Sequence, residues 1–591
     1  MSETDATAMA GDNARAEAGH ASDPASQDAK GSENVVAFTR RDRAETGPEG
    51  PAHTDPSPPQ DISRSETPAA DGSPSAVLPP DVEIELKLLV DPDRLADFND
   101  APVIAANARS KGVRKHLISV YYDTPERTLW RNGLTLRVRK SGARFVQTVK
   151  SESGDDPLRR GEWEASVSSL APDLALAMPF IPTKLRADLE AEGVEPVFTS
   201  DIHRHQRVVE LPSGTVEVAF DHGVLKAGEQ SMPVSEIELE LKGGSRLTIY
   251  ELALRLAEHG PVQPSIRSKS ARGFDLTVDA PPAARKPRKL RLHPEVTLDD
   301  AFATILRACL LHLLESIPAA KDGRDPEGIH QLRVALRRIR SALDLMRSVV
   351  SLSKLEALSS DARWFAQNLS AARDWDIFQK KTLPMIAKFC PTIHGFDALE
   401  EVAARRQSSA YRKARLVLAE RRTANFVLGL GAWIEARGWR SDVASDGLSQ
   451  LAEPTITFAA RMLSGQQAKV LKRGRGFKSL AADERHRVRL AVKKLRYIAD
   501  FLLPLYGDRK PVRRYSDRLT ELQKDLGSYN DMATTSSLLA GLGAEAPGSS
   551  SAAAAITGWQ AHAMVGAEAH VRSAWSDFVK AKPPWLREAE A

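Results

Sequence analysis

The chain has 591 residues, of which 42% are hydrophobic and 27% are charged, and its formal net charge is only +4. A chain of this length exceeds what one hydrophobic core serves, so about two to four domains are expected. With two cysteines, Cys309 and Cys390, a disulfide-built fold is excluded. The N-terminus lacks the apolar core of a signal peptide, and no run approaches the roughly 18 apolar residues of a membrane span. These features predict a cytoplasmic protein with no membrane partner.

The first segment, residues 1–79, is rich in Ala, Ser, Pro, Gly, Asp and Glu and has almost no aromatic residues. Such a segment cannot bury enough apolar surface to offset the entropy lost on ordering. The sequence therefore predicts a disordered tail, to which no chemistry is assigned.

The second segment, residues 80–278, alternates between polar and apolar residues in several places. Stretch 82–90 (VEIELKLLV) places Glu83, Glu85 and Lys87 on one face of a strand, since successive side chains take opposite faces. Stretch 235–243 (SEIELELKG) repeats the layout with Glu236, Glu238 and Glu240. Two acidic rows about 150 positions apart suggest two strands of one site for a hard divalent cation.

About eight strands are expected in this segment, and several carry charge on one side and aliphatic residues on the other. In 134–140 (LTLRVRK), for example, Arg137 and Arg139 oppose the aliphatic residues. A closed antiparallel barrel suits this pattern, because its outside can pack against helices while its inside forms a hydrated channel.

The basic residues of the segment match a substrate with several negative charges, since arginine can hold phosphate oxygens with two hydrogen bonds. They are Lys87, Arg137, Arg139, Lys150, Arg204, Lys226 and Lys269. The segment has no Walker-type glycine-rich loop. Carboxylates for Mg²⁺ or Mn²⁺ together with cations for phosphates indicate metal-assisted phosphoryl chemistry.

Residues 81–278 resemble the CYTH domain of the triphosphate tunnel metalloenzymes. The resemblance rests on Glu83-x-Glu85-x-Lys87, YYDT at 121–124, LRVR at 136–139, Lys150, Arg160-x-Glu162, Arg204, Asp221, the acidic strand at 236–240, and Ser268-Lys269 with ARGF at 271–274. It implies an eight-stranded antiparallel tunnel that hydrolyses inorganic or thiamine triphosphate, removes an RNA 5′ phosphate or cyclises ATP. One departure is Gln206, where relatives often have Lys or Arg, so the grip on substrate at that wall is expected to differ.

The resemblance also implies roles for the charged residues. The catalytic set is Glu83, Glu85, Lys87, Glu236 and Glu238, and the four glutamates are the implied metal ligands, with Glu240 as a further candidate. The seven basic residues would hold the triphosphate while a metal-polarised water attacks the terminal phosphorus. Which glutamate accepts the proton stays open.

A basic, proline-rich linker at 279–292 leads to a helical segment, residues 293–591, that contains an internal repeat. Stretch 330–345 aligns without gaps with 486–501. The aligned pairs are His330 with His486, Arg333 with Arg489, Arg337 with Lys493, Arg338 with Lys494 and Arg340 with Arg496. The sequence predicts two related helical bundles, at about 293–435 and 450–585. The expected fold class is α+β for the first domain, followed by an all-α domain.

The repeated stretches place their charges on a ridge. His330, Arg333, Arg337 and Arg340 fall within an arc of roughly 80° on a helix. A helix that concentrates positive charge needs a polyanion to offset the repulsion. The repeat, together with ARDWD at 372–376, resembles the CHAD domain, whose known members bind inorganic polyphosphate. This resemblance implies that the aligned residues and Arg373 contact polyphosphate, and that the repeats bind unequally if Asn530, which replaces Arg373 in the second repeat, makes weaker contacts.

The sequence thus predicts a metal-dependent inorganic triphosphatase, which yields pyrophosphate and phosphate, joined to a polyphosphate-binding domain. Three alternatives stay open: a polyphosphate-binding protein with a weakly active tunnel, an adenylate cyclase, or a hydrolase of another organic triphosphate. Nucleic acid is disfavoured as a partner, because the basic helices lack interleaved aromatic residues for base stacking. Association with polyphosphate granules is a further expectation.

Overall fold

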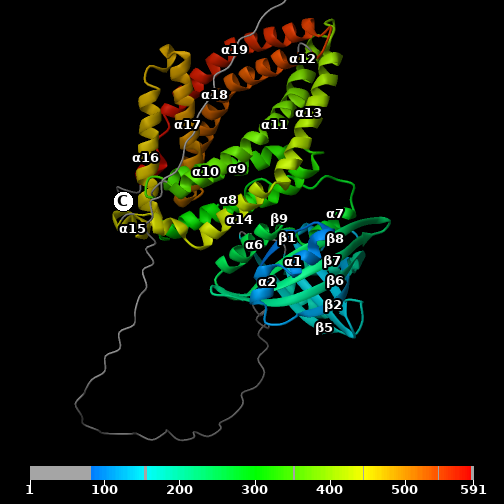
Figure 1. Ribbon diagram of the computed structural model, residues 1–591. Helices are drawn as coiled ribbons and strands as arrows, with labels where there is room; N and C mark the ends of the chain where they lie inside the picture. The colour runs from blue at the N-terminus through cyan, green and yellow to red at the C-terminus, as the bar shows by residue number, and fades with distance from the viewer. Residues whose placement is uncertain are drawn as a thin grey trace, which may run out of the picture. The chain divides into compact units, whose positions relative to one another are not determined.

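A computed structural model describes residues 81–151, 156, 158–350, 353–443, 445–542 and 545–587. The predicted disordered tail at 1–79 lies outside the described residues. The described chain forms a sheet with flanking helices and then an all-helical region (Figure 1). The α+β class predicted from the alternation of strands and helices is confirmed.

The sheet is antiparallel and follows the order β5-β4-β3-β2-β6-β7-β8-β1-β9. Its strands are β1 (Asp81–Leu89), β2 (Val113–Asp123), β3 (Leu134–Ser141), β4 (Arg144–Ser151), β5 (Arg159–Val167), β6 (Glu195–Leu211), β7 (Gly214–Ala227), β8 (Gln230–Gly244) and β9 (Gln263–Ser265). The first residues of β1 also pair with β5, so each strand from β1 to β8 has a neighbour on both sides.

The described residues thus hold nine strands where eight were predicted. The additional strand, β9, has the sequence QPS and pairs with the end of β1. A strand of three residues that contains proline shows no alternation from which it could be predicted.

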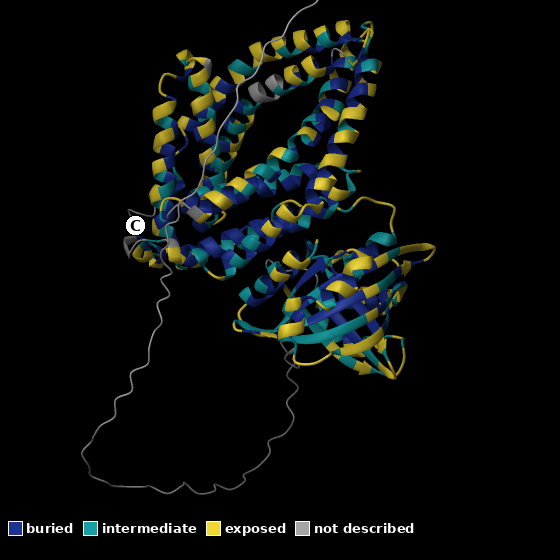
Figure 2. Ribbon diagram, in the orientation of Figure 1, coloured by how far each residue is buried: buried dark blue, intermediate teal, exposed yellow. Residues whose placement is uncertain are grey.

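The two faces of the sheet differ in chemistry, as the alternation predicted. Leu86 and Leu88 of β1 and Ile237 and Leu239 of β8 are buried in one hydrophobic core, together with helix α6 (Leu247–His259). A second core joins apolar residues of β3 and β4 to helix α5 (Thr183–Glu192). The opposite face carries the acidic and basic side chains and is called the charged face. Figure 2 shows buried, half-buried and exposed residues along the strands of the sheet.

Helix α7 (Lys269–Leu276) packs against strands β6, β7 and β8. It begins at Ser268, whose hydroxyl accepts a hydrogen bond from the backbone N–H of Ala271 at 2.9 Å, as an N-cap does. Gly273 lets the helix approach closely, because a Cβ at this position would lie 2.0 Å from Cε2 of Phe198. The helix thereby brings Lys269 and Arg272 to the charged face. The other helices of this part are α1 (Leu95–Asn99), α2 (Pro102–Asn107), α3 (Thr128–Arg131) and α4 (Leu174–Ala177).

The helical region contains α8 (Leu298–Asp322), α9 (Pro326–Met346), α10 (Ser353–Asn368), α11 (Ser370–Ile377), α12 (Leu383–Phe389), α13 (Phe396–Ala419), α14 (Arg421–Glu435), α15 (Ser445–Ala452), α16 (Thr455–Arg473), α17 (Ala482–Leu502), α18 (Lys510–Leu542) and α19 (Ser550–Val579). The repeated stretches lie on α9 and α17. Helix α9 begins with Asp325 as N-cap and Pro326 in the first turn, both favourable at a helix start. Its apolar residues Leu332, Leu336, Ile339 and Leu343 are fully buried.

Helix α8 is, among the described residues, the one helix long and apolar enough to cross a membrane by length and composition. No such run was expected from the sequence. In the structure 72% of its most apolar window is buried within the protein, which is typical of a core helix.

Candidate functional site

The two acidic strands are neighbours in the sheet. Strand register places Glu85 opposite Glu240 and Lys87 opposite Glu238. The Lys87 ammonium lies 2.7 Å from a Glu85 oxygen and 2.8 Å from a Glu238 oxygen. The structure thus brings together Glu85, Lys87 and Glu238, which the sequence placed in one site.

Glu236 lies deeper than the other glutamates, with no solvent exposure. It forms ion pairs with Lys269 and Arg272 of α7. The Lys269 ammonium also lies 2.6 Å from Asp221 and 3.0 Å from Glu238. Burial opposes the charge on Lys269, but Asp221, Glu236 and Glu238 together raise its pKa above its ordinary value. Lys269, predicted to hold substrate, here neutralises three carboxylates.

Glu83 lies at another part of the charged face, with Lys150 and Glu162. The Lys150 ammonium is 2.7 Å from Glu83 and 2.9 Å from Glu162. Burial, followed by the hydrogen bond with Glu162, raises the pKa of Glu83 to about 7. Burial opposes ionisation of Glu162 as well, but the hydrogen bond from Glu83 and the cations Lys150 and Arg137 lower its pKa. The pair can therefore hold one proton near neutral pH, on Glu83.

Three arginines of the predicted basic set lie on the charged face. Arg204 donates to both oxygens of buried Asp221, at 2.8 and 2.7 Å, and also pairs with Glu238. Arg137 pairs with Glu162 at 3.2 Å. Arg139 donates instead to the neutral Ser119 hydroxyl at 3.3 Å. Burial, with Arg137 and Arg204 nearby, lowers the pKa of Arg139 to about 10, so this cation is poorly compensated and suited to an anion.

Lys226 is not part of this arrangement, and its predicted place is wrong. It stands five positions after Asp221 on β7, so strand alternation turns it to the opposite face. Its side chain is exposed there. Glu240 does share the face of Glu236 and Glu238, and it lies 2.6 Å from the Lys242 ammonium; burial raises its pKa.

Several residues of the charged face were not among the predicted site residues. Gln206 of β6, the departure from the family pattern, accepts a hydrogen bond from the Lys115 ammonium at 2.8 Å. Strand β2 thus supplies a cation beside Gln206. Glu162 and Arg272 stood in the motifs that carried the resemblance. Asp221 did so too, and it lies with Glu236 and Glu238 so that their ligand oxygens are within 4.8 Å of one another. This all-oxygen donor set fits a hard divalent ion.

The helical region contains a second concentration of charge. Helices α9 and α17 contact each other, and the Arg337 guanidinium lies 5.9 Å from the ring centre of Tyr497 on α17. Burial lowers the pKa of Lys493 to about 8, and the next causes are the cations Arg337, Arg489, Arg340 and Arg333. The structure thus joins the ridges of both repeats into one basic cluster, defined here as Arg333, Arg337, Arg340, Arg489 and Lys493.

His330 and Arg373 lie beside this cluster. Burial, and then the charge of Arg373, lowers the pKa of His330. Arg333 donates at 2.7 Å both to the Ala366 carbonyl and to the Ser370 hydroxyl. These two partners are neutral. Burial lowers the pKa of Arg333, helped by the charges of Arg337 and Arg373 and opposed by the attraction of Asp374. The side chain of Asn530 lies outside the described residues.

The remaining predicted contacts are placed differently. Arg338 is buried with its guanidinium 5.6 Å from the ring centre of Phe501, and Lys494 is exposed. Each follows a cluster residue by one position, about 100° around the helix, so the structure places both away from the ridge. Arg496 pairs with Asp500 and donates to the Thr520 hydroxyl, and His486 is exposed.

Comparisons with known proteins agree with both motif sets. A CYTH domain model matches residues 81–274, and a CHAD domain model matches residues 304–540. An inorganic triphosphatase of Haemophilus influenzae is 27% identical over 205 residues, 33% of this chain and 54% of that protein, so the match spans about half of that relative. An uncharacterised protein of Mycobacterium tuberculosis is 25% identical over 411 residues, 65% of this chain and 75% of that protein.

Among solved structures, the CHAD domain from the plant Ricinus communis is 28% identical, with a TM-score of 0.44, and the match covers 51% of this chain and 98% of that one. The predicted resemblances to both families are confirmed by the family models. The chain therefore joins an N-terminal CYTH domain to a C-terminal CHAD domain.

Proposed function

We propose that the CYTH domain hydrolyses inorganic triphosphate to pyrophosphate and phosphate with the help of a divalent metal ion. The observation that carries this proposal is the charged face, where neighbouring acidic strands β1 and β8 share one surface with Arg137, Arg139 and Arg204. The similarity to a protein described as an inorganic triphosphatase supports the choice of substrate.

The residues of the charged face divide into two groups by chemistry. The carboxylates Glu83, Glu85, Glu236 and Glu238, with Glu240 and Asp221 beside them, would hold Mg²⁺ or Mn²⁺, which would lower the pKa of a bound water and offset phosphate charge. Arg137, Arg139 and Arg204 would orient the triphosphate and stabilise charge that develops on the leaving group. The pKa of Glu83, raised to about 7 in the chain without metal, would fall again on binding of a divalent ion.

Lys87 and Lys150 contact the acidic residues directly. When triphosphate enters, these ammonium groups can turn from carboxylate to phosphate partners, since lysine presents a mobile point charge. The carboxylates that they leave gain the metal as their new counter-charge. Exchange of partners keeps the buried charges compensated in both states.

The test is a substrate panel with the full chain: tripolyphosphate, pyrophosphate, ATP and thiamine triphosphate, each with Mg²⁺ and with Mn²⁺. Phosphate release from tripolyphosphate should dominate, and Glu85→Gln should reduce it by at least about 100-fold, because this residue is proposed to bind the metal. Cyclic AMP from ATP would favour a cyclase instead. Absence of turnover with every substrate would favour a ligand-binding tunnel.

We also propose that the CHAD domain binds inorganic polyphosphate through the basic cluster. The specific observation is that Lys493 lies among four arginines whose charge disfavours its own. A long polyanion would relieve this repulsion along the whole contact of α9 with α17. Competition between polyphosphate and duplex DNA at moderate salt tests the choice of partner, and preference for DNA would contradict it.

A further inference from the structure

A group of imidazoles lies on the face of the sheet opposite to the charged face. Strand register pairs His116 of β2 with His203 of β6, and Asp201 stands two positions before His203 on the same face. The neighbouring positions Lys115 and Arg204, also paired with each other, point to the charged face. The imidazole group and the carboxylates of the charged face are therefore separated by the thickness of the sheet.

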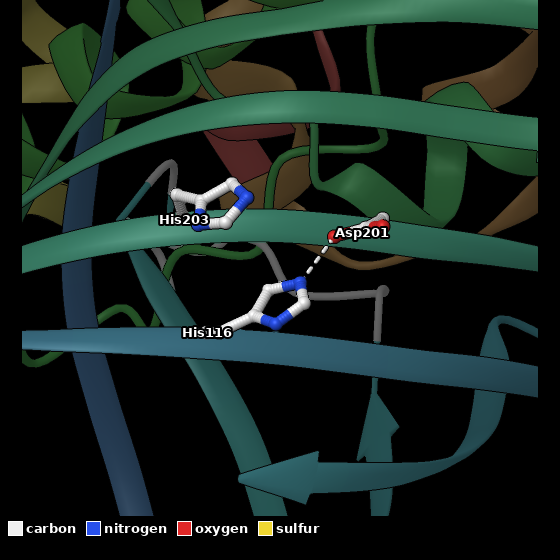
Figure 3. Close-up of side chains that lie close together, drawn as sticks. All are labelled: His116, Asp201 and His203. Atoms are coloured by element: carbon white, nitrogen blue, oxygen red, sulfur yellow. Dashed lines mark hydrogen bonds and ion pairs between the residues drawn. The ribbon is translucent and has the colours of Figure 1, made fainter. Parts of the chain in front are cut away.

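The three side chains point toward one another (Figure 3). His116 Nε2 lies 2.6 Å from Asp201 Oδ1. The rings of His116 and His203 are nearly parallel, with 4.4 Å between their centroids and 3° between their planes. One ligand atom from each residue can be chosen so that all three lie within 4.8 Å of one another.

A bound ion would need ligand atoms farther apart than the 2.6 Å between His116 Nε2 and Asp201 Oδ1, and within the 4.8 Å that spans the group. Bonds of about 2.0–2.1 Å in tetrahedral geometry place ligand atoms about 3.3 Å apart. Because the nitrogen lone pairs lie in the ring planes, the stacked rings must turn toward each other to bind one ion. The His116 and Asp201 side chains are 49% and 48% exposed, which leaves room for this rotation. An ion can also reach them directly from solvent.

The donor set decides which ion would bind. Two imidazoles and a carboxylate suit Zn²⁺, Ni²⁺ and Cu²⁺, whereas Mg²⁺ and Mn²⁺ prefer the all-oxygen donors of the charged face. A third imidazole, His222 of β7, is paired in register with His203, and their ring centroids are 5.2 Å apart. Imidazoles thus form a row across three adjacent strands, and their nitrogens are borderline donors that suit Zn²⁺ and Cu²⁺.

We propose that His116, Asp201 and His203 form a second metal site, which binds a borderline transition-metal ion of the Zn²⁺ class. The ion would link β2 to β6 on the face opposite to Lys115 and Arg204, which these two strands also carry. Such binding stabilises the folded chain in proportion to metal concentration, because the unfolded chain lacks the site. This inference is independent of triphosphate hydrolysis, since it uses residues of the other face.

The test uses the full chain, stripped of metal, with Cu²⁺ as a spectroscopic probe and Zn²⁺ as the ligand in calorimetry. Nitrogen coupling in the electron paramagnetic resonance spectrum identifies imidazole ligands, which the carboxylates of the charged face cannot imitate. The wild-type chain should show nitrogen coupling from one bound equivalent of Cu²⁺. The double variant H116Q/H203Q should lose it and bind Zn²⁺ at this site at least tenfold more weakly.

The matched control is H205Q. His205 lies on the same strand and the same face, two positions beyond His203, but its Nε2 contacts the Lys111 carbonyl at 2.8 Å and it is not part of the group. This variant should keep both the nitrogen coupling and the Zn²⁺ affinity. A second variant, D201N, should weaken Zn²⁺ binding without removing the imidazole signal, and it serves if the double variant does not fold.

Two results would overturn the proposal. One is a wild-type spectrum without nitrogen coupling. The other is equal coupling in the wild type and in a folded H116Q/H203Q chain, because the imidazoles would then come from elsewhere.

Discussion

Lys269 shows how single residues hold the charged face together. Its ammonium contacts Asp221, Glu236 and Glu238, and two of these carboxylates have no solvent exposure. A buried carboxylate that loses its cation keeps its desolvation penalty without the compensating attraction. Lys269 is therefore predicted to be essential for the stability of the domain, in addition to any role with substrate.

Replacing Lys269 by Met should lower the free energy of unfolding by about 1–3 kcal/mol. The three carboxylates keep Arg204, Arg272 and Lys87 as partners but lose the buried ammonium that they share. Urea denaturation of the full chain measures the change. Lys226→Met is the matched control, since Lys226 is exposed on the other face of β7, and it should change the stability by less than about 0.5 kcal/mol. Equal effects of the two substitutions would show that the contacts of Lys269 do not stabilise the fold.

Lys493 supplies a pH-dependent prediction for the basic cluster. Its pKa of about 8 in the free protein lies below that of an ordinary lysine, so it loses its proton as pH rises above 8. A bound polyanion favours the charged form and raises this pKa. Polyphosphate binding should therefore take up a proton between about pH 8 and 10, and the affinity should fall with pH in that range.

Calorimetry in two buffers with different ionisation enthalpies measures this uptake. The wild-type chain should take up close to one proton at pH 9. Lys493→Met should abolish the uptake, whereas Lys494→Met should keep it, since Lys494 is exposed and outside the cluster. Uptake that persists in the Lys493 variant would place the titrating group elsewhere.

At the scale of elements, helix α7 depends on a close approach to the sheet. A Cβ on Gly273 would lie 2.0 Å from the Phe198 ring, whereas a Cβ on Gly429 of α14 would meet nothing within 4 Å. Gly273→Ala should therefore destabilise the protein by about 1–3 kcal/mol through overpacking. Gly429→Ala should instead stabilise it by a few tenths to about 1 kcal/mol, because alanine favours helix.

Thermal unfolding of the two variants measures both changes in stability. Gly273→Ala should also reduce tripolyphosphate hydrolysis, since a displaced α7 would move Lys269 and Arg272 away from Glu236. If both substitutions changed stability in the same direction by similar amounts, the approach of α7 to Phe198 would not be as tight as described.

The elements also show what alternation can and cannot predict. It correctly assigned the faces of β1, β3 and β8, because each has an unbroken period of two with one aliphatic side. Lys226 was predicted to face the substrate because it is basic. Its odd spacing of five residues from Asp221 on β7 instead places it on the opposite face. On the helices, Arg338 and Lys494 were named from the aligned motif rather than from the ridge, and the structure places Arg338 in the interior and Lys494 at the surface.

Other features depended on tertiary contacts that no local pattern reveals. Lys115 of β2 provides a cation beside Gln206 of β6. Lys269 contacts carboxylates because α7 packs against β7 and β8. The convergence of the two repeats into one basic cluster also required knowing that α9 and α17 meet. The sequence named most of these residues, and the structure determined their partners.

At the scale of the whole molecule, both domains concentrate cationic side chains, but they differ in how these charges are compensated. In the CYTH domain the cations are mixed with carboxylates and are largely neutralised. In the basic cluster of the CHAD domain the nearest charges to Lys493 are other cations. A ligand that combines a divalent ion with a short phosphate chain suits the mixed charges of the CYTH domain. A long phosphate chain suits the basic cluster of the CHAD domain. A tether between them would raise the local concentration of phosphate chains near the charged face.

The account is tested most directly by phosphate release from tripolyphosphate with Mg²⁺, measured for the paired variants Arg139→Gln and Lys226→Gln in the full chain. Arg139 lies on the charged face with a neutral partner, so its loss leaves no orphaned carboxylate, whereas Lys226 lies on the opposite face. Arg139→Gln should lower kcat/KM by about 100-fold, typical for a group that stabilises transition-state charge, and Lys226→Gln should leave it unchanged. Equal rates for the two variants, or a greater loss for Lys226→Gln, would contradict a triphosphatase site on the charged face.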